Sequence, residues 1–533
     1  MKEQDLPKQS LREQSAWLLA AKLVGFGISF VLPLMIVRFL TQENVGLYRE
    51  SFQVITNALI ILPLGFSMSA YYFLARETEE RRGGAILNIL VFNFVVGGLA
   101  CLLLNLFPEL IGNIFKSEEL TRLAPKIGFV IWVWMFSTFL ETVAIANQEA
   151  RMATAFIVLA QFSKTLLMGA AIFTFGTVEA FIYAALIQGV VQTFILLLYL
   201  RSRFPGFWRR FEPRFFVEQL RYAIPFGVAG ILWMLQLDIH NYFVGHKFSS
   251  SDYAIYAYGC FEVPLIAMLS ESVVSVLIPR MNALQVAGDR DEMIRIMARA
   301  MQKLAFFYFP IYVFLLITAH TFITTLFTKQ YEASASIFVI NLTLLPFSVF
   351  ITDPIVRSYK ELGRLFLLTR VLVLLSLIAV LYFGLDSFGL TGMITAAVGA
   401  ILVEKVIAES MVVYKLGLGR QHLPLLTNVA KTAIISLVAG VVTFIVYSNV
   451  REYFLGVGEH FAEEMLSTHK LSTLDFFGGS LVLFISASVF APIYLLLANM
   501  WGLIEEDEKR SAMDMLRKIL PKRGGVPVSD VNG

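Results

Sequence analysis

Two short polar stretches in an otherwise apolar chain decide how this sequence folds. The first is FLTQENVGLYRESF, from Phe39 to Phe52, and the second is KFSSSDYAIYAYGC, from Lys247 to Cys260, about 208 residues later. Each stretch separates two apolar runs. The second run of each pair ends in an Arg, at FLAR (Phe73 to Arg76) and at LIPR (Leu277 to Arg280). The chain therefore contains an internal repeat.

A gapless alignment of the two stretches supports this repeat. It pairs Thr41 with Ser249 and Asn44 with Asp252, and it pairs Tyr48 with another tyrosine. Polar residues at such a turn satisfy the ends of two helices at the water boundary, which explains the composition without any function. The alternative interpretation is a gate element at the outer mouth of a transporter.

The composition is that of a membrane protein. Of the 533 residues, 57% are apolar and 16% are charged, whereas soluble domains have roughly 45 to 50% and about 25%. Many apolar runs are about 20 residues long, which is enough for a helix to cross a hydrocarbon core of roughly 30 Å. We therefore predict an all-α integral membrane protein.

The apolar runs predict about fourteen transmembrane helices. These lie near residues 15–38, 47–75, 84–107, 126–147, 154–175, 178–200, 218–244, 253–279, 303–327, 332–356, 365–385, 389–414, 426–449 and 474–500. Lys and Arg gather in the even-numbered connections and at both ends of the chain, and cytoplasmic loops retain these residues. We therefore expect a multi-pass protein of the inner (cytoplasmic) membrane with both termini in the cytoplasm.

The repeat also predicts the domain organisation. An offset of six helices preserves orientation, so the two halves are parallel and related by an axis along the membrane normal. The prediction is an N-terminal six-helix lobe (1–200), a cytoplasmic linker (201–217), a second six-helix lobe (218–415), two additional helices (416–503) and a cytoplasmic tail (504–533). The linker alternates Arg with Phe and Trp, which suits an anionic inner leaflet. Nucleic acid would fit its composition but not its location.

A basic amphipathic segment follows the second repeat. It is VLIPRMNALQVAGDRDEMIRIMARAMQK, from Val276 to Lys303. Arg295, Arg299 and Lys303 recur every four residues, opposite a stripe of Met, Ala and Leu. Asp289 is placed to cap the helix. We expect this helix to lie on the surface of the inner leaflet.

With its Pro-Arg exit, Gly-Asp turn and basic helix, this segment resembles the connection between helices 8 and 9 in the multidrug/oligosaccharidyl-lipid/polysaccharide exporter superfamily. ENVGLYRESF resembles the "eefGlYs" turn of the polysaccharide (O-antigen type) branch, and QLDIHNYFVGHKFSSSDYAIYAYG resembles the matching stretch of its second half. The resemblance covers the span count and topology of about the whole chain. It implies an alternating-access flippase that moves a polyprenyl-diphosphate oligosaccharide from the inner to the outer leaflet for cell-surface polysaccharide biosynthesis. The implied partners are membrane lipids and the polymerase and glycosyltransferases of that pathway.

Two alternatives remain at this level. An ion-coupled multidrug exporter of the same superfamily should have acidic cavity residues and twelve helices, so Lys164 and the two extra helices argue against it. A membrane enzyme acting on lipid-linked sugars would need paired acid and base groups in a long outer loop. The longest outer connection, Val450 to Thr473, has no such cluster, and we expect no enzyme, no metal and no cofactor. Without a Gly-Lys dipeptide there is no Walker A loop, so transport would draw on an H+ or Na+ gradient, the membrane potential or consumption of the product.

Charged residues at membrane depth are the candidate site, because a charge at a helix centre costs about 2.5 to 3.5 kcal/mol to insert. The predicted substrate-binding residues are Lys164, Gln161, Arg38, Arg49 and Lys22, and the predicted coupling residues are Asp238, His240, Glu262 and Glu404. Several of these residues also have an explanation that requires no role in transport. Lys164 would pair with a carboxylate on another helix, Lys22 would snorkel inward, and the two arginines would form a solvated ion cluster with Glu50.

Overall fold

The computed structural model describes residues 11–209, 211–466, 470–504, 506 and 510, without the side chains of residues 11–22, 80, 264–265, 466 and 471. Every regular element in this part of the chain is a helix, which confirms the predicted all-α fold. The first half contains α1 (Leu11–Phe39), α2 (Gln42–Ile61), η1 (Phe66–Ser69), α3 (Ala70–Arg76), α4 (Glu79–Leu106), α5 (Glu109–Phe115), α6 (Glu118–Ser137), α7 (Phe139–Ala146), α8 (Ala150–Thr174), α9 (Val178–Arg203) and η2 (Phe207–Arg209). The remainder contains α10 (Pro213–Lys247), α11 (Ser250–Gly259), α12 (Pro264–Ala287), α13 (Arg290–Phe327), η3 (Lys329–Tyr331), α14 (Ser334–Leu342), α15 (Leu344–Phe347), α16 (Asp353–Ser358), α17 (Lys360–Gly384), α18 (Leu390–Leu416), η4 (Arg420–Leu426), α19 (Thr427–Leu466) and α20 (Leu471–Met500).

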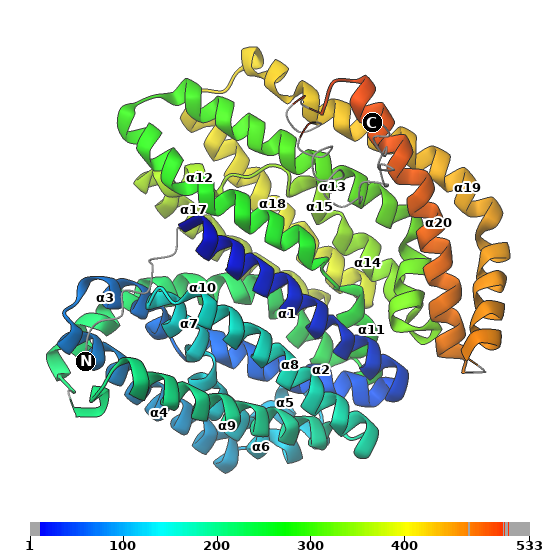
Figure 1. Ribbon diagram of the computed structural model, residues 1–533. Coiled ribbons are helices and arrows are strands. Elements are labelled where there is room, and N and C mark those ends of the chain that lie inside the picture. Colours follow the sequence, from blue (N-terminus) through cyan, green and yellow to red (C-terminus); the bar gives the residue numbers. More distant parts are fainter. Residues whose placement is uncertain (1–10, 210, 467–469, 505, 507–509, 511–533) are drawn as a thin grey trace, which may run out of the picture.

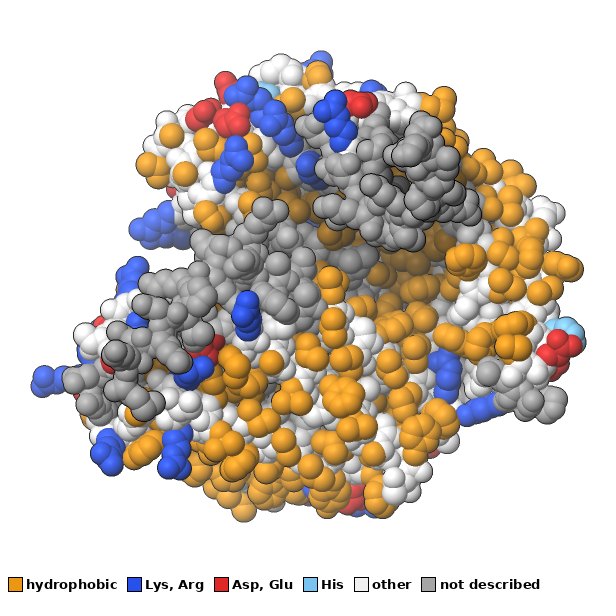
Figure 2. Space-filling view, viewed as in Figure 1, with side chains coloured by type: hydrophobic (Ala, Val, Ile, Leu, Met, Phe, Trp, Pro, Cys, Tyr) orange, Lys and Arg blue, Asp and Glu red, His pale blue; other side chains and the backbone are white. Residues whose placement is uncertain are grey.

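The helices identify a multi-pass membrane protein. Among the described residues, ten helices are long and apolar enough to cross a membrane, and eleven if α2 and the following bent segment form one span. Two shorter apolar segments, Leu23–Phe39 and Ser334–Phe347, lie outside that number, so fourteen spans stay a prediction. Figure 2 shows apolar side chains across the middle of the visible face, while Lys and Arg gather toward its edges.

The two repeated turns start their helices in the same way. The hydroxyl of Thr41 accepts a hydrogen bond from the backbone N–H of Asn44, at 3.3 Å. The hydroxyl of Ser249 accepts one from the N–H of Asp252, at 3.1 Å. These are N-caps, in which a side-chain oxygen satisfies a free N–H of the first helical turn. The aligned residues therefore perform the same local task at the start of α2 and α11.

The second span of each half is broken rather than continuous, contrary to the prediction. A bend of 44° separates α2 from the segment Phe66–Arg76, and α11 ends at Gly259, before α12 begins. At the first break Gly65 adopts a φ of 72°, which favours glycine. A Cβ on Gly65 would lie 2.9 Å from the backbone nitrogen of Gly227. Two glycines therefore allow α10 to pack directly against the break.

The basic amphipathic segment is also different from the prediction, since it forms the first turns of α13 rather than a separate surface helix. The side chain of Asp289 caps α13 as expected, accepting from the N–H of Glu292 at 3.0 Å. Met293 and Met297 are buried in the main core cluster, and α13 packs against α12. The apolar stripe is therefore covered by protein, and the same helix continues into the span.

The halves meet at the middle of the molecule (Figure 1). Within the first half α1 packs against α8 and α6 packs against α4 and α9, while in the second half α12 packs against α16 and α17 against α18. α2 and α11, which follow the repeated turns, lie side by side across the boundary. α10 contacts α2 and η1 as well as α17 and α18. The predicted domain boundaries stay a prediction.

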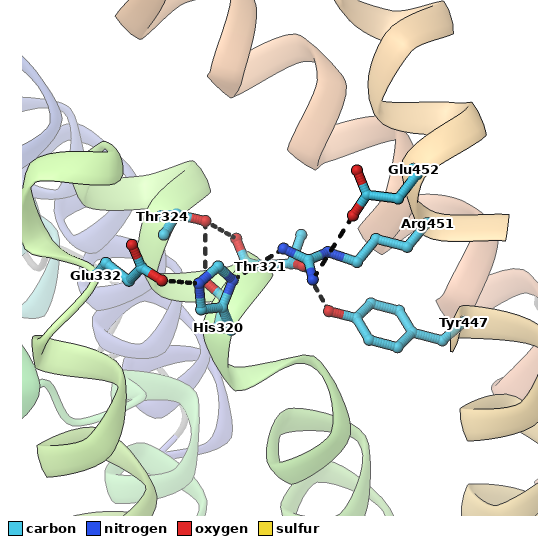
Figure 3. Close-up of polar contacts among 7 residues, drawn as sticks. All are labelled: His320, Thr321, Thr324, Glu332, Tyr447, Arg451 and Glu452. Carbon is cyan, nitrogen blue, oxygen red and sulfur yellow. Dashed lines mark hydrogen bonds and ion pairs between the residues drawn. The ribbon is translucent and has the colours of Figure 1, made fainter. Parts of the chain in front are cut away.

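The last two helices are fastened to the outside of α13. α19 and α20 pack against each other and against α13. α19 continues to Leu466, so most of the connection expected from Val450 to Thr473 is helical rather than an irregular loop. The Thr321 hydroxyl lies 2.7 Å from the hydroxyl of Tyr447. Arg451 donates to Nδ1 of His320 at 3.1 Å, and Nε2 of that histidine lies 2.8 Å from Glu332 (Figure 3). Polar contacts therefore attach α19 to the end of α13.

Candidate functional site

A cavity of about 640 Å³ lies between the two halves. α2 and α8 line it from the first half, and α10, α11, α14 and α18 line it from the second. Its wall combines aromatic rings with polar and charged side chains, a combination suited to binding an amphipathic ligand. The charged and amide-bearing members are Arg49, Gln53, Lys164, Asp238, His240, Asn241, Glu262 and Asn341.

Lys164 lines this cavity without a carboxylate partner. Its Nζ lies 5.3 Å from the ring centroid of Trp134 and 5.9 Å from that of Phe52. Among the described residues no ion pair involves this lysine. The predicted structural explanation, a salt bridge to another helix, is therefore not what holds it. Aromatic faces stabilise a cation only in part, so the ammonium group remains able to meet an anionic ligand.

The charged residues of the first repeated turn separate rather than forming one ion cluster. Arg49 lines the cavity with its guanidinium 4.6 Å from the ring centroid of Tyr258. Its neighbour Glu50 is fully buried and accepts a hydrogen bond from the hydroxyl of Ser250, at 3.2 Å. Because Glu50 is engaged with α11, it does not neutralise Arg49. The turn therefore contributes one cation to the cavity.

Arg38 lies elsewhere and does not line the cavity. Its guanidinium donates to the carbonyl oxygens of Leu326 and Thr325, at 2.9 and 2.8 Å. These carbonyls belong to the last turn of α13, where helical C=O groups lack internal partners and attract cations. The geometry gives Arg38 a structural task, which is to join α1 to the end of α13.

Three predicted coupling residues line the cavity from the second half. Asp238 accepts from the side-chain amide of Asn241, at 3.3 Å. Nδ1 of His240 lies 2.8 Å from the hydroxyl of Tyr256. Glu262 occupies the break between α11 and α12. The wall on this side is therefore acidic, in contrast to the cations contributed by α2 and α8.

Comparison with known proteins identifies the family. The family model described as "Polysaccharide biosynthesis protein" matches residues 35–336. The chain belongs to this family. No curated protein sequence matches it significantly. The family agrees with the resemblance read from the sequence, which is thereby confirmed.

Solved structures show which fold this family member shares. A lipid II flippase MurJ in an inward closed conformation aligns with a TM-score of 0.66 and 15% identity, over 91% of this chain and 98% of that one. An inward-facing multidrug resistance MATE transporter of the MOP superfamily gives 0.59 and 16%, over 74% and 98%. A MOP superfamily transporter from Pyrococcus furiosus, described as having a binding pocket of reverse polarity, gives 0.54 and 17%, over 77% and 98%. At such identities the alignments show the fold.

Glu404, the fourth predicted coupling residue, is buried but does not line the cavity. It forms an ion pair with Arg370 of α17 at 2.9 Å and accepts a hydrogen bond from the side-chain amide of Gln236. The guanidinium of Arg370 lies 4.7 Å from the ring centroids of both Trp233 and Phe366. Sequence reasoning missed Arg370, although its position inside the predicted span 365–385 was a signal.

Gln161 is not among the residues that line the cavity. Gln161 lies one turn before Lys164 on α8, close to α1, since a Cβ on Gly25 would be 3.4 Å from its Cγ. The side chain of Lys22 lies outside the described residues. Of the predicted substrate-binding residues, the structure brings Lys164 and Arg49 to the cavity.

Proposed function

We propose that this protein is a flippase that moves a polyprenyl-diphosphate-linked saccharide from the inner to the outer leaflet by alternating access. Its family and its fold, shared with a protein described as a lipid II flippase, support the proposal. The observation that carries it is the cavity between the halves, which Lys164 and Arg49 line without carboxylate partners among the described residues. No catalytic residue and no cofactor are part of the proposal.

The two sides of the cavity receive different tasks in this proposal. Lys164 and Arg49 bind the diphosphate, because charge-assisted hydrogen bonds to phosphate are among the strongest available. Asn241 and Asn341 present amides to sugar hydroxyls. Asp238 and Glu262 would repel a diphosphate, so they serve the coupling ion, H+ or Na+. His240 belongs to the same wall.

The repeated turns form the outer closure of the cavity. A Cβ on Gly46 of α2 would lie 1.7 Å from the carbonyl oxygen of Ser250 in α11. Only a glycine permits this approach of two backbones. Glu50 adds its hydrogen bond to Ser250 one turn further along. Separation of α2 from α11 at this seam is the step that opens the cavity to the outer side.

The topology and partners follow from the same proposal. Both termini are cytoplasmic and the protein lies in the inner membrane, as the distribution of Lys and Arg predicts. The polymerase and glycosyltransferases of the pathway supply and consume the lipid-linked saccharide on opposite sides of the membrane.

The test is lipid flipping in proteoliposomes. A fluorescent polyprenyl-diphosphate oligosaccharide is placed in one leaflet, and its arrival in the other is followed with and without a pH or sodium gradient. We expect arrival that depends on the protein and decreases in Lys164→Gln but not in the control Arg364→Gln. Arg364 is an exposed cation outside the cavity lining.

The outcomes separate the proposal from its rivals. If no lipid arrives but a cationic dye is exported along the gradient, the protein is a multidrug exporter, which the acidic wall would then explain. A chemically altered lipid-linked sugar would show a membrane enzyme. An unchanged lipid that crosses only with the protein supports the flippase.

A further inference from the structure

A second recess, of about 690 Å³, lies where α3 meets the first turns of α10. In Figure 1 this is the region beside the α3 label, at the left of the molecule. Tyr72 and Phe73 line it from α3, and Arg214, Arg221 and Tyr222 are among the lining residues from α10. It shares no lining residue with the cavity between the halves. The recess is therefore a separate feature of the molecule.

One face of α10 makes the recess basic. Arg214, Glu218 and Arg221 are spaced by four and then three residues, which places them on the same side of a helix. The carboxylate of Glu218 is approached by Arg81 of α4, at 4.0 Å. No ion pair involves Arg214 or Arg221 in the part of the chain that the structure describes. The recess is therefore lined by two arginines and one carboxylate, which leaves it with a net positive charge.

The floor of the recess is aromatic. The rings of Tyr72 and Tyr222 have centroids 4.5 Å apart, and Phe73 lies 5.6 Å from Tyr222. The guanidinium of Arg76 lies 4.2 Å from the centroid of the Tyr72 ring and donates to its hydroxyl at 2.7 Å. Tyrosine with arginine is the composition of the boundary between hydrocarbon and headgroups. α3 ends at Arg76, so the recess lies at the level where the bent span ends.

Exposed apolar side chains continue from the recess along α10. Val217, which lines the recess, is 50% exposed, and Phe226 is 60% exposed with its ring centroid 5.4 Å from that of Tyr222. A ligand held by Arg214 and Arg221 would therefore place its remaining length along the exposed apolar surface that begins at Tyr222 and continues to Phe226, one turn further along α10. This combination of an anionic head and an apolar tail is the chemistry of a phospholipid.

We propose that this recess binds the headgroup phosphate of an anionic phospholipid from the adjacent leaflet. Arg214 and Arg221 pair with the phosphate, Tyr72 and Tyr222 offer hydroxyls beside it, and the acyl chains lie along the face of α10 that carries Tyr222 and Phe226. The bound lipid bridges α3 and α10, and α10 contacts both halves. The site is distinct from the cavity proposed for the saccharide lipid, since different parts of α10 line the two cavities and they share no lining residue.

Native mass spectrometry of the full-length protein tests the proposal. Detergent micelles are supplied with phosphatidylglycerol, phosphatidylcholine, inorganic phosphate or polyprenyl diphosphate. We expect the unaltered protein to retain phosphatidylglycerol in preference to phosphatidylcholine. Arg214→Gln/Arg221→Gln should weaken this retention about 30-fold, from the contribution that each cation makes beside an anionic lipid.

Two further variants control for folding and for general charge. Arg214→Lys/Arg221→Lys keeps both charges and should keep most of the affinity. Arg290→Gln/Arg364→Gln removes two exposed cations near other helix ends and should leave retention unchanged. This control separates a built site from loss of overall positive charge.

Each outcome decides the proposal. Equal retention of phosphatidylglycerol by the unaltered protein and by Arg214→Gln/Arg221→Gln would overturn it, as would an equal loss in the Arg290→Gln/Arg364→Gln control. Displacement of phosphatidylglycerol by polyprenyl diphosphate, or binding of inorganic phosphate alone, would assign the recess to another ligand. Because the readout is binding, failure here leaves the proposed flipping untouched, and failure to flip leaves this site untouched.

Discussion

Lys164 and Arg370 are both cations within membrane-spanning helices, but their surroundings differ completely. Arg370 is enclosed by the carboxylate of Glu404 and by two aromatic rings. Lys164 lies beside the rings of Phe52 and Trp134 and lines the cavity, and it has no ion pair among the described residues. A charge at membrane depth is therefore not sufficient to mark a functional site. The partner decides, because a cation already paired with a carboxylate has little left to offer a ligand, whereas an unpaired one is available to an anionic group.

The largest expected effect comes from breaking the paired region. Arg370→Ala leaves Glu404 buried without its cation, and loss of one partner of a buried pair costs about 3 to 5 kcal/mol. We expect a large decrease in the free energy of unfolding, measured by denaturant titration in detergent. The double variant Arg370→Ala/Glu404→Gln should recover much of the loss. If Arg370→Ala alone is as stable as the parent, the ion pair is not structural and the comparison fails.

Lys164→Gln is the matching change in the unpaired region. It removes the charge from a hydrogen bond to phosphate, a bond worth about 1.5 to 3 kcal/mol. The flipping rate in proteoliposomes should therefore decrease about tenfold to a hundredfold, while unfolding changes little. The reverse result, normal flipping with reduced stability, would place Lys164 in the same structural class as Arg370.

Gly46→Ala tests whether the close packing of α2 against α11 positions the cations Arg49 and Lys164 in the cavity. The added Cβ would meet the carbonyl oxygen of Ser250 at 1.7 Å, so α11 has to shift, and overpacking costs about 1 to 3 kcal/mol. We expect slower flipping and a lower unfolding midpoint. Gly27→Ala is the control, because a Cβ there has no neighbour within 4 Å. If the two substitutions change flipping and the unfolding midpoint equally, the cause is the replacement of a helical glycine by alanine in general, and not the contact between α2 and α11.

The smallest effect concerns an ion pair whose cation is exposed. Lys329 pairs with Asp475 of α20 at 2.7 Å, and the lysine side chain is 66% exposed whereas the aspartate side chain is 8% exposed. The hydrogen bond that the Lys329 ammonium donates to this carboxylate raises the pKa of the lysine. The stabilisation is therefore complete below the unfolded value of about 10.4 and is lost as the pH rises through the higher folded pKa.

Lys329→Gln should cost less than Arg370→Ala, because the exposed Lys329 ammonium is already largely solvated and water can take its place beside Asp475. The difference in unfolding midpoint between the parent and Lys329→Gln should be present at about pH 8 and smaller above about pH 11. A difference that grows with pH would contradict the assignment. Compared with Arg370→Ala, this substitution measures how much of the effect of a pair depends on burial of the cation, because both carboxylates are buried.

The sequence by itself determined the membrane class, the all-α fold, the repeat and the local start signals. Apolar length follows directly from composition, and the caps of Thr41, Ser249 and Asp289 involve residues three positions apart. It also indicated several cavity residues, since an ionisable residue in a span is costly and usually faces a partner or a cavity. Lys164 and Asp238 were found in this way.

Only the tertiary structure decided which charges are paired and where helices break or continue. Glu404 is separated from Arg370 by 34 positions and from Gln236 by 168, and Arg38 reaches carbonyls on a helix 288 positions away. The break at Gly65 depends on how closely α10 approaches, and α13 remains one helix because other helices cover its apolar stripe. The physical reason is that hydrophobicity and capping act over a few residues, whereas the neutralisation of a charge depends on which distant helix the fold places beside it.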